Sequence, residues 1–236
     1  NYGMGFDEIL ESFQKKEKRD GIHDCRNFLK TSKIKYEFNY SIKSLKDIPT
    51  FVPVNHYCRN FLQRKSLLTT IDSIITVALV TVGLSNLTTR KTTWILKNNL
   101  DKTFPYKFTK LRKVQLAAIY CYDLIGVSQN YPFSKIDEWE NKLKRRFNIA
   151  FFPEGSPSRE LKPTNGDFEK YLAHLKEKIG NIQILPTSVY YTDKIFFIKF
   201  HRPLAVNKTS HEVAKSAILK IAESLPPHMR GHYKTA

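Results

Sequence analysis

The chain has 236 residues, of which 41% are hydrophobic, 13% aromatic and 26% charged. This composition excludes a disordered or collagen-like chain, and the length predicts one large domain with its own core. The 39 lysines and arginines outnumber the 22 acidic residues and give a formal net charge of +17. We therefore expect a polyanionic partner. Three classes fit this description: nucleic acid, an anionic lipid surface and an acidic carrier protein.

The three cysteines, Cys25, Cys58 and Cys121, show neither a disulfide framework nor metal-ligand spacing, which favours a reducing compartment. Residues 1–20 are polar and charged, so no secretory signal peptide is expected. The longest apolar run, residues 74–84, is too short for a membrane span of ~20 residues. We predict a cytoplasmic protein without a metal or cofactor, which contacts a membrane only peripherally.

The first predicted element is an amphipathic helix over residues 6–18, because Phe6, Ile9, Leu10 and Phe13 recur at helical spacing. The sequence allows two locations for this helix. It can pack on the domain, or it can lie on anionic lipid with its basic end at the lipid surface. A second helix is expected at 24–30, and alternating aromatic residues predict a strand over 35–42. Residues 1–35 form the predicted N-terminal helical segment.

Strands and helices then alternate through a predicted domain of residues 36–225. The expected strands are 51–54, 93–97, 119–127, 148–152, 182–189 and 194–200. The expected helices are 70–84, 108–118, 134–146, 166–178 and 209–224. This alternation predicts an α/β fold, a single domain with a mostly parallel central sheet flanked by helices. Residues 226–236 are expected to form an irregular tail.

Two of the apolar strands end on polar residues. The run 51–54 stops at Asn55 and His56, and the run 149–152 stops at a proline followed by Glu154 and Gly155. The proline ends the strand and the glycine permits a tight turn. Because ligands of open α/β sheets bind at the carboxyl ends of strands, we expect a site here. A histidine and a glutamate in such positions are what the activation of a hydroxyl for acyl transfer requires.

These strand ends resemble two motifs of the glycerolipid acyltransferase family, whose members include lysophosphatidic acid and glycerol-3-phosphate acyltransferases. The family has Asn-His-x-x-x-x-Asp after one strand and Phe-Pro-Glu-Gly-Thr-Arg-Ser after a later one. Here residues 152–159 read Phe-Pro-Glu-Gly-Ser-Pro-Ser-Arg. Weaker similarity follows in the family's order at residues 45–55, 94–100, 184–187 and 200–204. The resemblance implies transfer of a fatty acyl group from acyl-CoA or acyl carrier protein to a hydroxyl or amine, in lipid metabolism such as phospholipid biosynthesis.

The resemblance gives His56 the role of general base. A neutral histidine, with a pKa near 6.5, can take the proton of an acceptor hydroxyl, and a carboxylate on its other nitrogen orients it. The family's aspartate falls where this chain has Phe61, and residues 57–70 look like an insertion. Asp72, the next carboxylate, opens an apolar helix. Asp72 is therefore either the catalytic partner of His56 or a helix N-cap. A third possibility is that His56 has no orienting carboxylate.

The acceptor-binding residues that the resemblance implies are Glu154, Gly155, Ser156 and Arg159. A carboxylate does not hold a phosphate, so we expect Glu154 to orient a basic residue or hydroxyl while backbone N–H groups contact the acceptor. Pro157 stands at the family's arginine position, and Arg159 lies two residues later. Gln129 stands near a second arginine position of the family. A phosphorylated acceptor is therefore left open.

Two other function classes remain. One is a catalytically degenerate member that binds lipid or carrier protein without turnover, and the other is a basic nucleic-acid-binding module. The basic residues are spread along the chain without zinc spacing or a single-strand stacking motif, so no nucleic acid is expected. The remaining histidines lack metal-ligand spacing and are predicted to be surface or structural residues: His23, His174, His201, His211, His228 and His232.

Overall fold

The computed structural model describes residues 6–57, 67–97, 109–127, 135–155, 158–164 and 166–234. The helices are α1 (Phe6–Gln14), α2 (Gly21–Thr31), α3 (Leu67–Ser85), α4 (Thr109–Cys121), α5 (Ile136–Lys144), α6 (Asp167–Ile179) and α7 (Ser210–Ser224). The strands are β1 (Tyr36–Tyr40), β2 (Thr50–Pro53), β3 (Lys91–Lys97), β4 (Ile125–Val127), β5 (Phe147–Phe151), β6 (Gln183–Ile184), β7 (Thr187–Thr192), β8 (Ile195–Phe200) and β9 (Leu204–Ala205).

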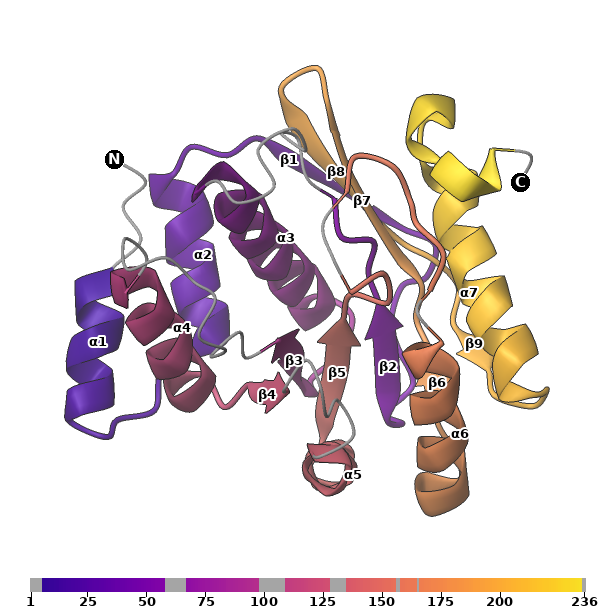
Figure 1. The fold of residues 1–236 in the computed structure, drawn as a ribbon, viewed down its shortest axis with the longest axis horizontal. Helices are drawn as coiled ribbons and strands as arrows, with labels where there is room; N and C mark the ends of the chain where they lie inside the picture. Colours follow the sequence, from indigo (N-terminus) through magenta and orange to yellow (C-terminus); the bar gives the residue numbers. More distant parts are fainter. Residues whose placement is uncertain are drawn as a thin grey trace.

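Six strands form the central sheet in the order β4-β3-β5-β2-β6-β9 (Figure 1). All neighbouring pairs in it are parallel except β6 with β9. The predicted α/β fold with a mostly parallel sheet flanked by helices is confirmed. Because β2 and β5 are parallel neighbours, the residues that follow them lie together at one edge of the sheet.

A second sheet has the order β1-β8-β7 and was not predicted as a separate layer. The expected strand over 182–189 divides at Leu185 and Pro186, so that β6 joins the central sheet and β7 joins the second one. Proline lacks the N–H group that an uninterrupted strand would use. Val54, directly after β2, makes a parallel bridge to Thr187 at the start of β7, which connects the two sheets.

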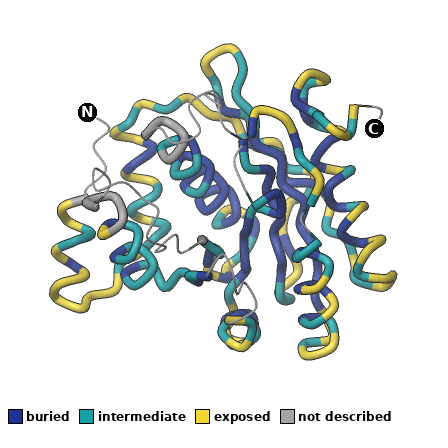
Figure 2. Tube along the Cα trace, in the orientation of Figure 1, coloured by how far each residue is buried: buried dark blue, intermediate teal, exposed yellow. Residues whose placement is uncertain are grey.

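Both faces of the central sheet are covered. Ala150 belongs to a cluster of buried residues that includes Leu79 and five other residues of α3, while Ile149 and Phe151 pack with Trp139 of α5 and Phe168 of α6. Figure 2 shows β2 and β5 dark blue in the middle of the molecule and the outer sides of α6 and α7 yellow. Burial on both faces explains why these strands are continuous apolar runs in the sequence.

The N-terminal helix packs on the domain, which is one of the two positions left open by its sequence. The rings of Phe13 and Tyr120 meet edge to face with centroids 5.5 Å apart. Lys18 Nζ donates to the carbonyl of Tyr120 at 2.7 Å, and the Arg19 N–H donates to the carbonyl of Cys121 at 2.8 Å. The helix ends at Gln14 rather than at residue 18, because the chain turns at residues 15–16, where Lys16 has a φ of +57°, before Lys18 and Arg19 contact α4.

The C-terminal segment is more regular than expected. Residues 227–229 and 231–233 form two short 3-10 turns, and Met229 is buried. The Leu161 N–H donates to the carbonyl of Met229 at 2.8 Å, which attaches these turns to the loop that follows β5. Gly231 has a φ of +53°, and a Cβ there would lie 2.3 Å from the carbonyl oxygen of Leu161. This close approach requires a glycine.

Candidate active site

The carboxyl ends of β2 and β5 bring His56 and Glu154 together. After β5 the chain turns through Gly155, whose φ of +66° is accessible to glycine without strain. The turn directs the Glu154 side chain back toward the neighbouring strand end, where Oε1 accepts the backbone N–H of His56 at 2.6 Å. The two sequence motifs therefore meet through this hydrogen bond.

Both oxygens of Glu154 contact the backbone. Oε2 accepts the N–H of Lys162 at 3.0 Å, because the loop after β5 folds back across the strand end. Burial raises the pKa of Glu154 to about 7, against the opposing effect of the two N–H groups and of the Lys162 charge. The sequence predicted that this carboxylate orients a basic residue or a hydroxyl. The described contacts instead make it a brace for the backbone at His56.

The imidazole of His56 is held on two sides. Its ring stacks on Phe152, with centroids 3.9 Å apart and an interplanar angle of 11°. A hydrogen bond of 2.8 Å joins His56 Nε2 to Ser73 Oγ on α3. Trp94 lies behind Phe152 at a centroid distance of 5.2 Å, and its Nε1 donates to Thr81 of α3 at 3.0 Å. The ring position is thus fixed by β5 and α3 together.

Asn55 fixes the residue before His56 to the second sheet. Its Nδ2 donates to the carbonyl of Val189 at 2.8 Å, and its Oδ1 accepts the N–H of Val189 at 2.7 Å. The side chain is buried, so both of its polar groups obtain their hydrogen bonds inside the protein. The side-chain amide of Asn55 therefore makes the two hydrogen bonds to Val189 in β7 that a neighbouring strand would otherwise make.

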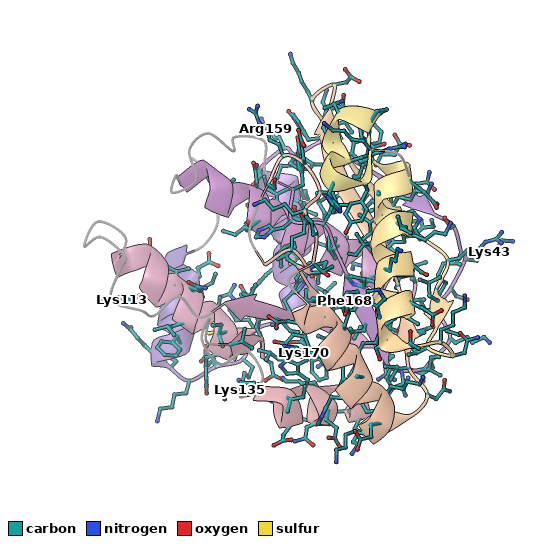
Figure 3. The ribbon with its side chains drawn as sticks, turned by 45° about the vertical axis from the view of Figure 1, so that its right-hand side comes forward. Lys43, Lys113, Lys135, Arg159, Phe168 and Lys170 are labelled. Atoms are coloured by element: carbon teal, nitrogen blue, oxygen red, sulfur yellow. The ribbon has the colours of Figure 1, made fainter. Side chains whose placement is uncertain are left out.

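A narrow crevice runs beside these residues. Its lining includes His56, Glu154, Arg159, Glu160 and Met229. Arg159 is exposed, and Figure 3 shows its side chain near the edge of the molecule in that view. The exposed Arg159 and Glu160 bring opposite charges to the crevice, and Arg159 is the position that the sequence assigned to acceptor binding.

Asp72 lies inside α3, five residues after the helix begins at Leu67, so the N-cap interpretation is wrong. The residue is 1% exposed. It immediately precedes Ser73, the residue that contacts His56. The structure therefore places the helical turn of Asp72 against the candidate base.

Several positions named by the sequence argument lie outside the described residues: Ser156 of the predicted acceptor site, Phe61, Gln129 and Pro157. Sequence reasoning did not find Ser73, Phe152 as a stacking partner, or Val189. Ser73 directly follows Asp72 at the start of an apolar helix, and this was the only signal for it in the sequence.

Neither a metal site nor a membrane span is found in the ranges that the structure describes. There, no group of three or more histidine, cysteine, aspartate or glutamate side chains could hold a metal ion. No helix among the same residues is long and apolar enough to cross a bilayer. Basic side chains are dispersed, since Figure 3 shows Lys43 and Lys113 on opposite sides of the molecule.

The fold is similar to that of a solved acyltransferase. The crystal structure of the 1-acyl-sn-glycerophosphate (LPA) acyltransferase PlsC from Thermotoga maritima matches 92% of this chain and 78% of that chain, with a TM-score of 0.51 and 17% sequence identity. No family model and no curated protein sequence matches the chain. At this level of identity the similarity establishes a shared fold.

Proposed function

We propose that the protein is an acyltransferase that moves a fatty acyl group from a thioester donor, acyl-CoA or acyl carrier protein, to the hydroxyl or amine of a lipid-like or small acceptor. The observation that carries this proposal is the meeting of His56 and Glu154 at neighbouring strand ends, joined at 2.6 Å. The fold shared with an LPA acyltransferase supports the same reaction class.

In the proposed reaction His56 is the general base. The neutral imidazole takes the proton of the acceptor hydroxyl while the hydroxyl oxygen attacks the acyl carbonyl. In the whole reaction the C–S bond of the donor breaks, and the donor leaves as a free thiol with a proton from His56. The stacking on Phe152 and the brace from Glu154 keep the imidazole in place during both proton transfers. Asp72 is the proposed carboxylate partner of this histidine.

The acceptor is proposed to enter the crevice beside Arg159. An exposed guanidinium in the lining of the crevice suits an anionic group on the acceptor, because arginine binds phosphate and carboxylate through two parallel hydrogen bonds. The solved acyltransferase with this fold acts, by its name, on a glycerophosphate. Ser156 is a proposed further contact to the acceptor, whereas the N–H of Gly155 already donates to the carbonyl of Phe152 at 3.1 Å.

Thiol release tests the function. Wild-type protein is mixed with palmitoyl-CoA or palmitoyl acyl carrier protein and with glycerol 3-phosphate, lysophosphatidic acid, a lysophospholipid or a primary amine. We expect thiol release that depends on one of the acceptors and that falls in His56→Ala. The matched control is His23→Ala, which removes an exposed histidine of α2. Full activity of His56→Ala would contradict the role of the base.

Binding measurements on the wild-type protein distinguish the two other function classes. Salt-sensitive binding of the donor without any thiol release would favour a degenerate binding protein. Tight, salt-sensitive binding to duplex DNA together with failure to bind donor or lipid would favour a nucleic-acid-binding module.

Anionic lipid is the proposed membrane partner, in a peripheral association driven by the net charge of +17. Binding to vesicles that contain phosphatidylglycerol should weaken as salt rises, and neutral vesicles should bind less. Lys16→Glu is a suitable variant, since Lys18 and Arg19 hold α4 and their reversal would disturb the fold. A basic residue near the surface contributes ~1 kcal/mol, about a fivefold change in binding. Lys43→Glu, in another part of the fold, is the control.

Equal binding of neutral and anionic vesicles, unaffected by Lys16→Glu, would remove α1 from the proposed membrane contact. Co-sedimentation at several salt concentrations distinguishes the two results.

A further inference from the structure

A side-chain hydroxyl of the protein itself lies at the candidate base. Ser73 Oγ is 2.8 Å from His56 Nε2, within the distance at which a base can remove a proton. Both side chains are half-buried, so neither is sealed in the core. In direct transfer, the acceptor hydroxyl would need the same imidazole nitrogen that Ser73 now contacts.

The setting of this contact resembles that of an activated nucleophile. Such a site has a hydroxyl within hydrogen-bond reach of a base, and the base is held by further groups. Here Phe152 stacks on the imidazole and Glu154 holds the backbone of His56. Ser85, at the other end of α3, donates to the carbonyl of Val82 at 2.7 Å and accepts from the guanidinium of Arg26 at 3.2 Å. Ser73 instead contacts an imidazole, a group that can take its proton.

We infer that Ser73 is a catalytic nucleophile that carries the acyl group between donor and acceptor; the inference rests on the proposed acyltransferase function. In the first step Ser73 Oγ attacks the thioester carbonyl, and its proton passes to His56 Nε2. The C–S bond breaks, and His56 returns the proton to the thiolate, which leaves as a free thiol. Ser73 then holds the acyl group as an ester.

In the second step the acceptor hydroxyl attacks the ester carbonyl and gives its proton to His56. The bond from the carbonyl carbon to Ser73 Oγ breaks, and the proton returns to that oxygen. The acyl group has then moved from thiol to acceptor without any other reagent. This route separates the two substrates in time, so donor and acceptor need not occupy the site together.

The test is to trap the acyl-enzyme in the absence of acceptor. Wild-type protein is mixed with palmitoyl-CoA, and separately with palmitoyl acyl carrier protein, quenched in acid and measured by intact mass spectrometry and peptide mapping. We expect one palmitoyl group per chain on the peptide that contains Ser73, and a burst of about one equivalent of thiol. Addition of the acceptor identified by the turnover assay should discharge the adduct.

Three variants make the test specific. Ser73→Ala should lose the adduct and the burst, and Ser73→Cys should keep an adduct as a thioester that hydroxylamine cleaves. Ser85→Ala, on the same helix, should behave as wild type. Circular dichroism and thermal unfolding establish that each variant is folded.

Three results would overturn the inference, and they differ in what they say of the proposed function. Acceptor-dependent turnover without an adduct, retained in Ser73→Ala, would show direct transfer and leave the acyltransferase proposal intact. No thiol release from wild-type protein with any donor and acceptor would overturn both. An adduct that maps to another residue would assign the nucleophile elsewhere.

Discussion

Two histidines of this protein make the same kind of contact in two different regions. His56 bonds through Nε2 to Ser73 at 2.8 Å, at the carboxyl edge of the central sheet. His201, after β8, bonds through Nε2 to Ser188 at 2.9 Å and to Ser224 of α7 at 3.0 Å. His56 is half-buried and lines the crevice, whereas His201 is 5% exposed.

The difference shows that access, and not the serine contact, distinguishes a candidate base from a structural histidine. Around His201 the hydrogen bonds close on themselves, since Ser188 also bonds to Ser224 at 2.8 Å and to the carbonyl of Ile221 at 3.1 Å. Burial lowers the pKa of His201 to about 4, which keeps the imidazole neutral at pH 7. None of His201, Ser188 and Ser224 lines the crevice at His56.

The largest expected effect is a loss of activity, and it should follow replacement of His56 but not of His201. His56→Ala should lower the rate of acyl transfer by about 10²–10⁴, as removal of a positioned base does. The thermal unfolding midpoint should change little, because the side chain is half-buried at the rim of the crevice. Thiol release and differential scanning calorimetry measure the two quantities. An unfolding midpoint that falls together with the activity would give His56 a structural role as well.

His201→Ala should show the reverse pattern. Loss of a buried imidazole leaves a cavity and takes a partner from two hydroxyls, so we expect the free energy of unfolding to fall by about 2–4 kcal/mol. Urea unfolding measures this change, and activity per folded molecule should remain near that of wild type. His23→Ala, an exposed histidine, is the control. A loss of activity in fully folded His201→Ala would contradict the comparison.

Glu154→Gln tests whether the brace at His56 matters to the site. A carboxamide can accept from one of the two backbone N–H groups but turns its own N–H₂ toward the other. We expect a loss of about 1–3 kcal/mol from this mismatch, with a fall in kcat at nearly constant KM for the donor. Glu177→Gln, at an exposed position of α6, is the control. Unchanged kcat would show that the brace does not position the base.

The free energy of unfolding of Glu154→Gln should depend on pH differently from that of wild type. The pKa of Glu154 is raised to about 7 from an ordinary 4.5, so the folded state keeps a proton that the unfolded state releases between these values. The stability contributed by this group is present below pH 4.5 and is lost as the pH rises through 7. Wild type should therefore lose stability relative to Glu154→Gln between pH 5 and 8. A constant difference across this range would contradict the assignment.

The smallest effect concerns acid sensitivity. The pKa of His201 lies below its ordinary value of 6.5, so only the unfolded state binds a proton as the pH falls from 6.5 toward 4. This group therefore makes the protein less stable with falling pH in that window. His201→Ala removes the group, so the difference in unfolding free energy between wild type and variant should shrink from pH 7 to pH 4.5. A difference that stays constant would contradict the burial argument.

Strand ends were more predictable from sequence than the contacts made there. The apolar runs before His56 and Glu154 predicted two buried strands, and both formed as parallel neighbours. Parallel pairing brings the following residues together whatever the details of the loops. The division of the predicted strand 182–189 was missed, because a proline within an apolar run is compatible with either one strand or two.

The site was predicted in outline for the same reason. The positions of His56 and Glu154 follow from the sheet, whereas the role of the carboxylate depends on where Lys162 and its loop return. No local pattern encodes that return. Ser73 was missed because the residues between it and β2 separate the helix from the strand in sequence, so its contact with His56 depends on the packing of α3.

The two hydrogen bonds between Asn55 and Val189 determine when the site can form during synthesis of the chain. Their partners are 134 residues apart in sequence, and those of the contact from His56 to Glu154 are 98 residues apart. A chain that leaves the ribosome from its N-terminus exposes the histidine long before either partner exists. Pairings at such separation form slowly, because a long loop must close first. We therefore expect nascent chains that have not yet reached Val189 to lack a competent site, so that His56 is in place only after the second sheet has been synthesised.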